Sequence, residues 1–400
     1  MFETPSGLPA RSRVSKLRIA LFTPFGPTIG AGSVVFRSLL PCLKEEEVRW
    51  FYLADSDANA PNATFLGHCL LGGSIINDAI TSARLFVAQS HPKIDEYVRT
   101  ILAWAPDIVW VNAMNEGLLV GQKLLDAGVR HLHVSVHDNP ASSAQRSRRY
   151  RHMAPFIDRC HTNLLKRAHS VDVISEPMRS YYRDRILIDS RVVYRFIDPR
   201  TLSVPEPVPS SKVIVIGHAG SAYSAPELLA LLGVLRSIAR SDGIRFQFLN
   251  IGGSPIFAHA AKQFPEIVVN AGHLSSEDQV ISRLRECHFL YTMYSFNARH
   301  RVFRETSQPC KLSTYLMAGR PILAHCPAGS STIDMLSKFK LGLCVTSMKE
   351  APLVNGIRGI MNFRLEEDDV SRAINYYCGY RNLDNLRSCF GLKKTGPMAV

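Results

Sequence analysis

Short apolar runs rich in β-branched residues recur along the chain, and each is followed by a segment whose apolar positions repeat with the period of a helix. This alternation is typical of a parallel sheet whose strands are connected by helices, so the sequence predicts an α/β fold. Strands of a first series are expected at 17–23, 48–53, 107–112, 131–137 and 170–175. Strands of a second series are expected at 212–217, 246–251, 289–292, 321–325 and 341–345. The two series predict two sheets that follow one another in the chain.

The stretch between the two series is rich in proline. Residues 198–211 include Pro199, Pro205, Pro207 and Pro209, and such a composition can continue neither a helix nor a central strand. We therefore place a domain boundary there, between two Rossmann-like, doubly wound domains that face each other across a cleft. Ligands of such open sheets bind at the carboxyl ends of the strands. The expected order is a first domain at 1–197, a linker at 198–211, a second domain at 212–370, and a C-terminal helix at 371–400 that packs back towards the first domain.

The composition indicates a globular protein with anionic partners. The 400 residues carry 47 Lys+Arg against 34 Asp+Glu, a net charge of +13, with 46% hydrophobic residues and a mean hydropathy of +0.00. These values exclude collagen, coiled coils and intrinsic disorder. No window approaches the ~20 apolar residues of a membrane-spanning helix, and the first residues contain no apolar signal core, so we expect a cytoplasmic protein. The charge favours nucleotide phosphates, acidic glycans or anionic lipid. Nucleic acid is not expected, because no recognised nucleic-acid motif accompanies the charge.

The cysteines also exclude a class of protein. They are nine in number and contain no Cys-x-x-Cys pair. An odd and widely spread set predicts neither a disulfide framework nor a zinc site, so we expect reduced thiols and no bound metal.

A glycine-rich loop follows the first strand. Gly30, Gly32 and Ser33 open the next helix, where backbone N–H groups can meet an anion. The loop lacks the Gly-x-Gly-x-x-Gly spacing of dinucleotide-binding folds. An anion-binding loop and a plain tight turn both remain open.

The strand at 131–137 delivers His137 and Asp138 to its carboxyl end, and Pro140 forces a turn directly afterwards. A histidine beside a carboxylate can be held in one tautomer and can donate a hydrogen bond to a sugar hydroxyl or a phosphate. The alternative is that Asp138 caps the next segment while His137 only packs. His137 and Asp138 are thus candidate catalytic residues.

The strongest motif lies in the second half, in the segment Pro309–Leu323, which reads PCKLSTYLMAGRPIL. We expect a helix to begin near Cys310 and end at Gly319, and a strand to open at Pro321. The helix N-terminus and Lys311 would form a diphosphate site that adds a dipole to a point charge, which makes Lys311 a third catalytic candidate. The segment resembles the donor-binding motif of retaining glycosyltransferases with the GT-B fold, family four, also called glycosyl transferases group one.

The resemblance covers roughly residues 212–346. The turn at Gly220 and Ser221 is similar to the family's first glycine turn of this domain, and the loop from Gly272 to Leu274 is similar to the loop that receives the nucleotide base. The resemblance implies no bound cofactor and a UDP-, GDP- or dTDP-sugar as substrate. The donor-binding residues that we expect are Gly30, Gly32, Gly220, Ser221, Gly272, His273, Leu274, Arg301, Arg304, Glu305, Thr306, Pro309, Cys310, Leu312 and Thr314.

The sequence departs from the family at two acidic positions. Many members carry two glutamates separated by seven residues, the first touching the sugar hydroxyls and the second the ribose, where this chain has Thr306 and Thr314. Glu305 lies one residue from the first position and could substitute there, whereas a threonine hydroxyl accepts fewer bonds than a carboxylate. The basic residues that many members carry after the first strand of this domain are also missing. Arg301 or Arg304 would then assist in meeting the phosphate charge.

Basic residues gather in the first domain at Arg146–His152. Because the family binds acceptors mostly with this domain, the resemblance implies a glycan or lipid-linked acceptor, and the charge would suit peripheral binding to an anionic membrane surface. A solvated helix face is the alternative. The predicted function is a nucleotide-sugar-dependent glycosyltransferase (hexosyltransferase type) of polysaccharide biosynthesis that acts with retention. A nucleotide-sugar 2-epimerase of the same fold and a non-catalytic sugar-nucleotide or glycan-binding protein are the alternatives.

Overall fold

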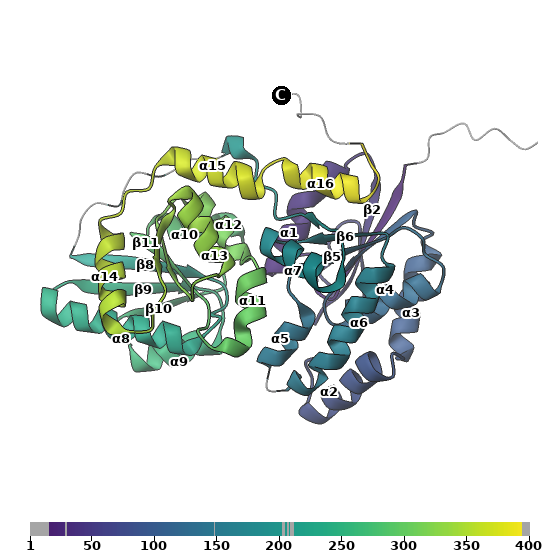
Figure 1. The fold of residues 1–400 in the computed structure, drawn as a ribbon, viewed down its shortest axis with the longest axis horizontal. Coiled ribbons are helices and arrows are strands. Elements are labelled where there is room, and N and C mark those ends of the chain that lie inside the picture. The colour runs from purple at the N-terminus through teal and green to yellow at the C-terminus, as the bar shows by residue number, and fades with distance from the viewer. Residues whose placement is uncertain are drawn as a thin grey trace, which may run out of the picture.

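The computed structural model describes residues 16–28, 30–147, 149–201, 205, 208 and 212–393, and these form two sheets, one in each half of the molecule (Figure 1). The first sheet consists of β1 (Arg18–Thr23), β2 (Glu47–Leu53), β3 (Ala63–Gly67), β4 (Ile108–Asn112), β5 (Leu132–Val136), β6 (Ser170–Val173) and β7 (Arg191–Val192). The second consists of β8 (Val213–Ala219), β9 (Arg245–Ile251), β10 (Val268–Gly272), β11 (Phe289–Met293), β12 (Ile322–His325) and β13 (Gly342–Val345).

The strand order is that of two doubly wound domains. The first sheet runs β3-β2-β1-β4-β5-β6-β7 and the second β10-β9-β8-β11-β12-β13. Neighbouring strands pair in parallel in both sheets, and parallel neighbours need crossover helices between them. The α/β class expected from the alternation of strands and helices is therefore confirmed.

Helices connect the strands in each half. Those of the first half are α1 (Ala31–Leu39), α2 (Ile75–Ser82), α3 (Pro92–Ala103), α4 (Glu116–Asp126), α5 (Pro140–Arg146), α6 (Ala154–Arg167) and α7 (Glu176–Ile186), with short 3-10 or π turns at Leu40–Leu43, Ala83–Val87 and Arg151–Met153. Those of the second half are α8 (Ala225–Asp242), α9 (Pro255–Gln263), α10 (Glu277–Arg285), α11 (Arg301–Thr306), α12 (Cys310–Ala318), α13 (Ser331–Phe339) and α14 (Glu350–Met361), with a 3-10 turn at Ala298–His300.

The chain then returns across the top of both halves as α15 (Glu367–Cys378) and α16 (Arg381–Cys389), the yellow helices of Figure 1. The guanidinium of Arg387 in α16 donates to the carbonyl of Cys42 at 2.6 Å and pairs with Glu46 at 3.2 Å. Ser170 at the start of β6 donates to the carbonyl of Cys389. The last helix of the described chain thus packs on the first sheet's domain.

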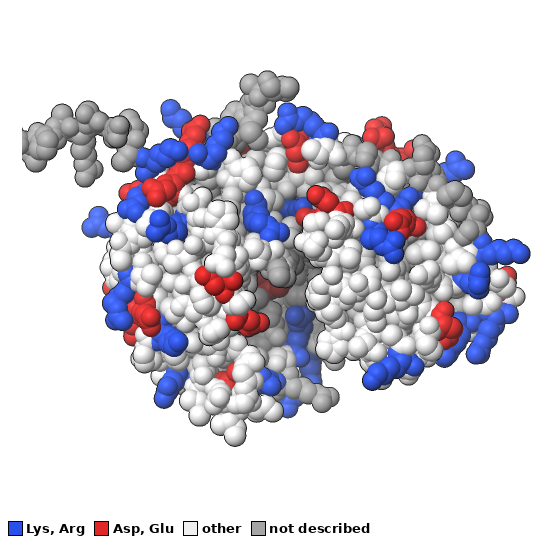
Figure 2. Space-filling model, turned by 180° about the vertical axis from the view of Figure 1, so that it is seen from behind, with Lys and Arg blue, Asp and Glu red and all other residues white. Residues whose placement is uncertain are grey.

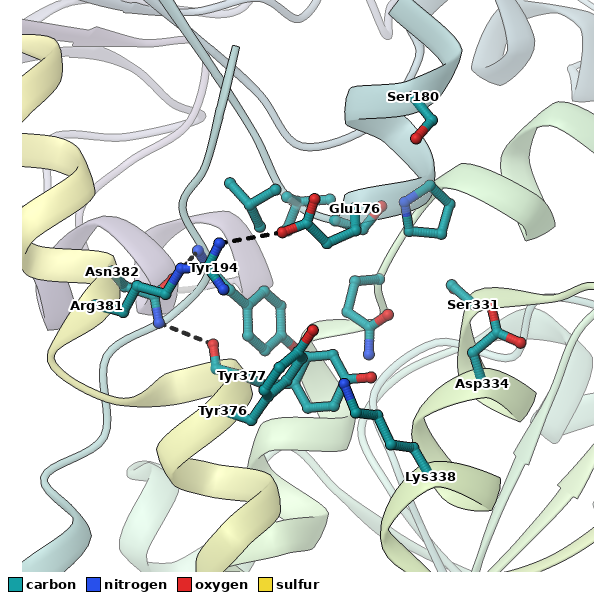
Figure 3. A pocket seen from close by; sticks show the side chains of 15 residues that line it. Glu176, Ser180, Tyr194, Ser331, Asp334, Lys338, Tyr376, Tyr377, Arg381 and Asn382 are labelled. Carbon is teal, nitrogen blue, oxygen red and sulfur yellow. Dashed lines mark hydrogen bonds and ion pairs between the residues drawn. The ribbon is translucent and has the colours of Figure 1, made fainter.

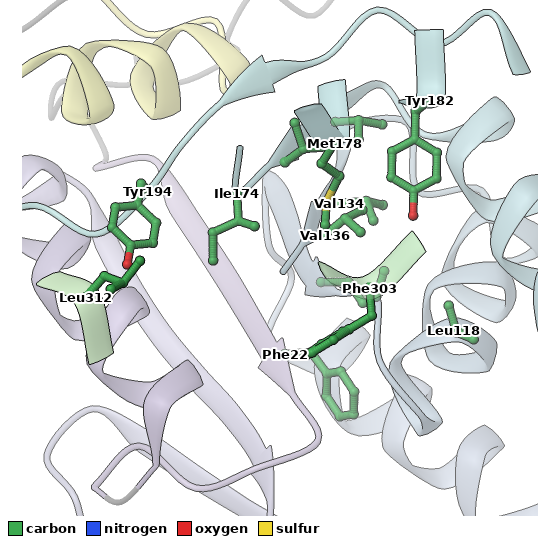
Figure 4. Packing of buried hydrophobic residues seen from close by; sticks show 14 of the residues in the cluster. Phe22, Leu118, Val134, Val136, Ile174, Met178, Tyr182, Tyr194, Phe303 and Leu312 are labelled. Carbon is green, nitrogen blue, oxygen red and sulfur yellow. The ribbon is translucent and has the colours of Figure 1, made fainter. Parts of the chain in front are cut away.

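Burial explains why the central strands were visible in the sequence. The strands β4 and β5 are buried along their whole length, as in parallel strands covered on both faces. One buried cluster takes side chains from both halves, including Val134 and Val136 from the first and Phe303 and Leu312 from the second (Figure 4). The two domains therefore share apolar contacts in addition to the chain that links them.

All the expected strands are present, with ends shifted by two residues or fewer. Three further strands, β3, β7 and β10, were not expected. Each lies at an edge of its sheet, where only one side is paired; β3 is only partly buried, β10 is largely exposed, and β7 has two residues. The expected linker 198–211 contains a 3-10 turn at Pro199–Thr201, and most of the remainder lies outside the described residues.

Candidate functional site

The carboxyl edge of the second sheet is formed by glycine turns. Gly220, Gly252 and Gly272 follow or end β8, β9 and β10 and have φ of 78°, 132° and 69°, a region that side chains disfavour. The Gly220 amide donates to the Ile251 carbonyl at 2.8 Å, and the Gly252 amide donates to the Gly272 carbonyl at 2.8 Å. A Cβ on Gly253 would lie 2.6 Å from His273 Nε2. The turns leave a backbone-lined edge to which a ligand can come close.

The helix α12 begins beside this edge. Pro309 precedes it, no side chain caps its N-terminus, and Gly319 ends it in the left-handed conformation, with φ of 63°. An uncapped helix N-terminus presents backbone N–H groups without intrahelical acceptors, together with the positive end of the helix dipole. The helix has the bounds that the motif predicted, and Ile322 then opens β12 after Pro321.

Lys311 reaches from the first turn of α12 towards the end of β8. Its Nζ lies 3.0 Å from His218 Nε2, donates to the Ser221 carbonyl at 2.6 Å, and lies 4.5 Å from the centre of the Tyr223 ring. Burial lowers the pKa of the Lys311 ammonium to about 7 and holds the pKa of His218 well below its usual value. Lys311 is only 9% exposed, because Tyr223 and His218 cover it.

His137 and Asp138 approach from the other domain, where β5 ends. Ser307 of the second domain donates from Oγ to Asp138 Oδ1 at 2.6 Å. The His137 ring stacks on Phe36, with ring centres 4.9 Å apart. Burial lowers the pKa of His137 to about 4, and it raises the pKa of Asp138 although the Ser307 bond acts against it. His137 is therefore neutral at pH 7.

Arg146 belongs to this interdomain region and not to a basic surface. Its guanidinium lies 3.5 Å from the centre of the Phe303 ring in the second domain, and its charge partly offsets the burial that raises the pKa of Asp138. The expectation that the segment Arg146–His152 forms one exposed cluster is wrong at this residue, because α5 turns its last side chain towards the opposite domain. Residue 148 lies outside the described residues.

Two hydrogen bonds from the first domain fasten the segment that precedes α12. The Ser175 hydroxyl donates to the carbonyl of Thr306, and the Tyr194 hydroxyl donates to the carbonyl of Pro309 at 2.8 Å. The Thr306 hydroxyl donates to the Val302 carbonyl at 2.6 Å, within its own helix. Contacts from the first domain thus hold the backbone on which the donor-site candidates lie.

An unexpected carboxylate lies beside Thr314, the position at which many members of the family carry their second glutamate. Thr314 Oγ1 donates to Glu277 Oε1 at 2.8 Å, and Arg195 donates to Glu277 Oε2 at 2.7 Å. Glu277 comes from the first turn of α10, just after the loop at Gly272–Leu274. Neither Glu277 nor Arg195 was expected at the site from the sequence. Local sequence carried no signal for them, since they meet Thr314 only in the folded chain.

Other expected donor residues already have partners within the protein or are buried in the core. Arg301 and Glu305 pair with each other along α11 at 2.9 Å, and Arg304 donates to the Asn297 carbonyl at 3.0 Å. Leu312 is fully buried in the core beside Tyr194 (Figure 4), so its side chain cannot touch a donor, which corrects that expectation.

The glycine-rich loop of the first domain has its own geometry. Gly30 is the residue before α1, with φ of 105°. A Cβ on Gly32 would lie 2.6 Å from the Phe25 ring, so any side chain at this position would force that ring to move. Seen from behind, the molecule has a hollow between its two lobes in which Lys or Arg side chains are visible (Figure 2).

A cavity of about 350 Å³ lies at another place between the domains, beneath α15 and α16 (Figure 3). Glu176 and Tyr194 line it from the first domain, Asp334 and Lys338 from α13, and Tyr376 from α15. The Lys338 ammonium lies 3.5 Å from the centre of the Tyr376 ring. The site residues expected from the sequence do not line this cavity.

Two general properties of the described residues bear on the site. They contain no group of three or more His, Cys, Asp or Glu side chains that could hold a metal ion. None of the helices in that part of the chain is long and apolar enough to cross a membrane.

No protein-family model and no curated protein matches the sequence, but solved structures match the fold. Sucrose-phosphate synthase from Thermosynechococcus elongatus aligns with a TM-score of 0.66 at 14% identity, covering 93% of this chain and 97% of that one. α,α-Trehalose 6-phosphate synthase from Burkholderia multivorans gives 0.65 at 10% identity, covering 94% and 98%. A structure described as a UDP-N-acetylglucosamine 2-epimerase from Listeria monocytogenes gives 0.59 at 11% identity, covering 96% and 100%. The chain therefore has the GT-B fold of glycosyltransferases, as expected. At identities this low, the similarity shows the fold alone.

Proposed function

We propose that the protein is a nucleotide-sugar-dependent glycosyltransferase that transfers a sugar, with retention, to a glycan or lipid-linked acceptor. The observation that carries the proposal is the meeting of Lys311, the uncapped N-terminus of α12 and the Gly220 turn at one sheet edge, in a fold that glycosyltransferases share. A diphosphate at this edge would meet a cation and aligned backbone N–H groups. Such fixed groups stabilise the charge that develops on a leaving diphosphate.

The residues of the first domain would act on the sugar. His137 is neutral at pH 7 because its pKa is about 4, so its role is that of a hydrogen-bond partner to a sugar hydroxyl. Asp138 would support it from the same strand end, and its bond to Ser307 holds the two domains in register around the donor.

The nucleoside would lie along the loop from Gly272 to Leu274, which the resemblance implies as the base-binding loop. Glu277 lies one turn further along the chain and accepts from the Thr314 hydroxyl. Its carboxylate would provide the acceptor for ribose hydroxyls that the Thr314 side chain lacks. Support for this assignment is the 2.8 Å contact at the position where the family carries its second glutamate.

The experiment is a thermal-shift panel with UDP-, GDP-, dTDP-, ADP- and CMP-linked sugars. A donor present at 100 times its Kd stabilises the folded state by about 2.7 kcal/mol, and we expect one base to stand out. The variant Lys311→Met should lose most of the shift. The absence of a thermal shift with every donor at millimolar concentrations would contradict a nucleotide-sugar function. A thermal shift that survives in Lys311→Met would show that the donor does not bind at α12.

A 2-epimerase is the second candidate, since one structural neighbour is described as one. The two functions differ in what they need. An epimerase consumes the donor without an acceptor and releases its epimer, whereas a glycosyltransferase needs an acceptor for sustained turnover. Product analysis by NMR with the stabilising donor, in the presence and absence of glycan acceptors, separates them. Binding without turnover under both conditions would favour a non-catalytic sugar-nucleotide binder.

A further inference from the structure

The helix α2 in the first domain is amphipathic in the reverse sense. Its apolar side chains Ile75, Ile76 and Ile80 are 69%, 73% and 51% exposed, whereas Asp78 and Ser82 on the same helix are buried. A helix on the surface of a globular domain normally buries its apolar face and exposes its polar one. The apolar face of α2 is thus turned to the outside of the molecule.

A polar network fixes α2 in this orientation. The carboxylate of Asp78 accepts from the amides of Gly72 and Gly73 at 3.0 and 2.9 Å, from the Arg149 guanidinium at 2.7 Å, and from the Tyr150 hydroxyl. These partners lower the pKa of Asp78 despite its burial, so the carboxylate stays ionised and paired. The isoleucines are therefore presented on an anchored helix and not on a fraying one.

The apolar face continues into the next turn and has cations beside it. Val87 is 50% exposed at the end of the turn that follows α2. Arg84, Arg149 and Arg151 are exposed on this turn and on the segment that binds Asp78. Figure 1 places α2 at the lower end of the first domain, and in Figure 2 that end is largely white, with Lys or Arg side chains and a smaller area of Asp or Glu near it.

Acidic residues are missing from the two segments that form this surface. Between positions 69 and 94 the only Asp or Glu is Asp78, and residues 139–157 contain none. Since Asp78 and Arg149 neutralise each other, the remaining charged residues of these two segments are cations such as Arg84 and Arg151, which accompany the exposed isoleucines. That combination is complementary to one kind of partner, an anionic lipid bilayer, in which apolar side chains enter the acyl boundary while cations meet the headgroups.

We propose that α2 is a membrane-docking element that inserts Ile75, Ile76 and Ile80 into the interface of an anionic bilayer. This inference deepens the acceptor side of the proposed function, because α5 leads from Asp138 directly to the Arg149–Asp78 contact. A lipid-linked acceptor held at that bilayer would lie at the α2 end of the first domain. The helix α5 connects this end with Asp138 at the site. The docking itself does not depend on glycosyl transfer.

The test is co-sedimentation of the full chain with phosphatidylglycerol–phosphatidylcholine vesicles at low and high salt. We expect the wild type to bind these vesicles and not vesicles of phosphatidylcholine alone, and to retain part of the binding at high salt, since only the ionic share is screened. The double variant Ile75→Ser/Ile80→Ser should bind at least tenfold more weakly. The matched control is Leu187→Ser, which removes the more exposed Leu187 (86%) at the end of α7 and should bind as the wild type does.

A second variant reports insertion directly. In Ile76→Trp, addition of the anionic vesicles should shift the tryptophan emission to the blue, with circular dichroism confirming the fold. Equal vesicle binding by the wild type and the double variant would overturn the proposal, as would a wild type that ignores anionic vesicles. A dimer in sedimentation velocity that the double variant loses would also overturn it, by identifying a second copy of the chain as the occupant. Nucleotide-sugar binding by thermal shift is read separately, so failure of the docking surface leaves the proposed function standing.

Discussion

Lys311 is an amine held out of water at the start of a helix. Its Nζ donates to the Ser221 carbonyl and lies over the Tyr223 ring, so the ammonium is already placed at the glycine turn. Hydrogen bonds to charged groups contribute about 1.5–3 kcal/mol, and Lys311→Met should therefore weaken nucleotide diphosphate binding by roughly ten- to a hundredfold in calorimetry. Methionine fills most of the volume that alanine would leave empty. Wild-type nucleotide affinity in a folded Lys311→Met protein would exclude the diphosphate role. Lys311→Arg should not retain full nucleotide affinity, because a guanidinium directs its N–H donors differently from an ammonium.

The lowered pKa of Lys311 gives a pH dependence with a definite sign. Its folded pKa of about 7 lies below the ordinary lysine value of 10.5, so between these values the unfolded chain binds more protons, and stability rises with pH across that window. A diphosphate beside the amine raises its pKa again. Binding at pH 8 should then take up close to one proton. Calorimetry in two buffers of different protonation enthalpy measures this uptake, and Lys311→Met should show none.

His137 tests the assignment of the sugar to the first domain. Because this neutral ring would contact the sugar and not the nucleotide, His137→Ala should lower kcat well over tenfold, while the donor Kd changes by less than about threefold, a difference of roughly 0.65 kcal/mol. Steady-state kinetics and calorimetry on the same preparation separate the two effects. Unchanged kcat would return His137 to a packing role against Phe36, the contact that the structure shows.

At the scale of elements, burial decides what could be predicted. Central strands such as β4 and β5 are buried along their whole length and consist mostly of apolar residues, so they stand out in the sequence. Edge strands such as β10 alternate little and lie mostly exposed, so nothing in their composition marks them. The helix at α12 was predictable because proline and glycine punctuate both of its ends. The burial of Lys311 was not, since it is covered by His218, which lies in β8, 93 positions earlier in the chain, and by Tyr223, which follows that strand.

The end of α12 provides an element-scale prediction. Gly319 has the left-handed conformation at the helix end, with φ of 63°, which costs a residue with a Cβ about 1–2 kcal/mol. Gly319→Ala should therefore destabilise the protein by about that amount. The control is Gly233→Ala within α8, where a Cβ meets nothing within 4 Å, and which should stabilise by about 0.5–1 kcal/mol. Urea unfolding followed by circular dichroism measures both, and equal effects would contradict the backbone explanation.

At the scale of the whole molecule, the sequence predicted two domains but not how they are fastened. The Arg195–Glu277 pair and the Asp138–Ser307 bond join residues 82 and 169 positions apart. Neither pair has a local pattern, because such contacts depend on the angle at which two folded domains meet. The return of the C-terminal helix to the first domain was expected, and the structure adds the residue that fastens it, Arg387.

Arg387 joins the two ends of the chain through a buried ion pair. Its guanidinium donates to the Cys42 carbonyl and contacts Glu46, and the two charged side chains are 9% and 6% exposed. Removing one partner leaves the other charge buried without compensation, which costs about 3–5 kcal/mol. Arg387→Met should thus lower the thermal unfolding midpoint by several degrees. The control is Arg372→Met, which should change the midpoint little. Arg372 is 65% exposed in its pair with Asp369, and exposed pairs contribute at most about 1 kcal/mol. If both variants unfold at the same temperature in calorimetry, α16 is not a structural fastening of the first domain. We expect that only Arg387→Met is destabilised and that its donor affinity stays unchanged, because α16 is far from α12 in the sequence and contacts β6 and the Cys42 turn. In that case α16 holds the domains together without shaping the site.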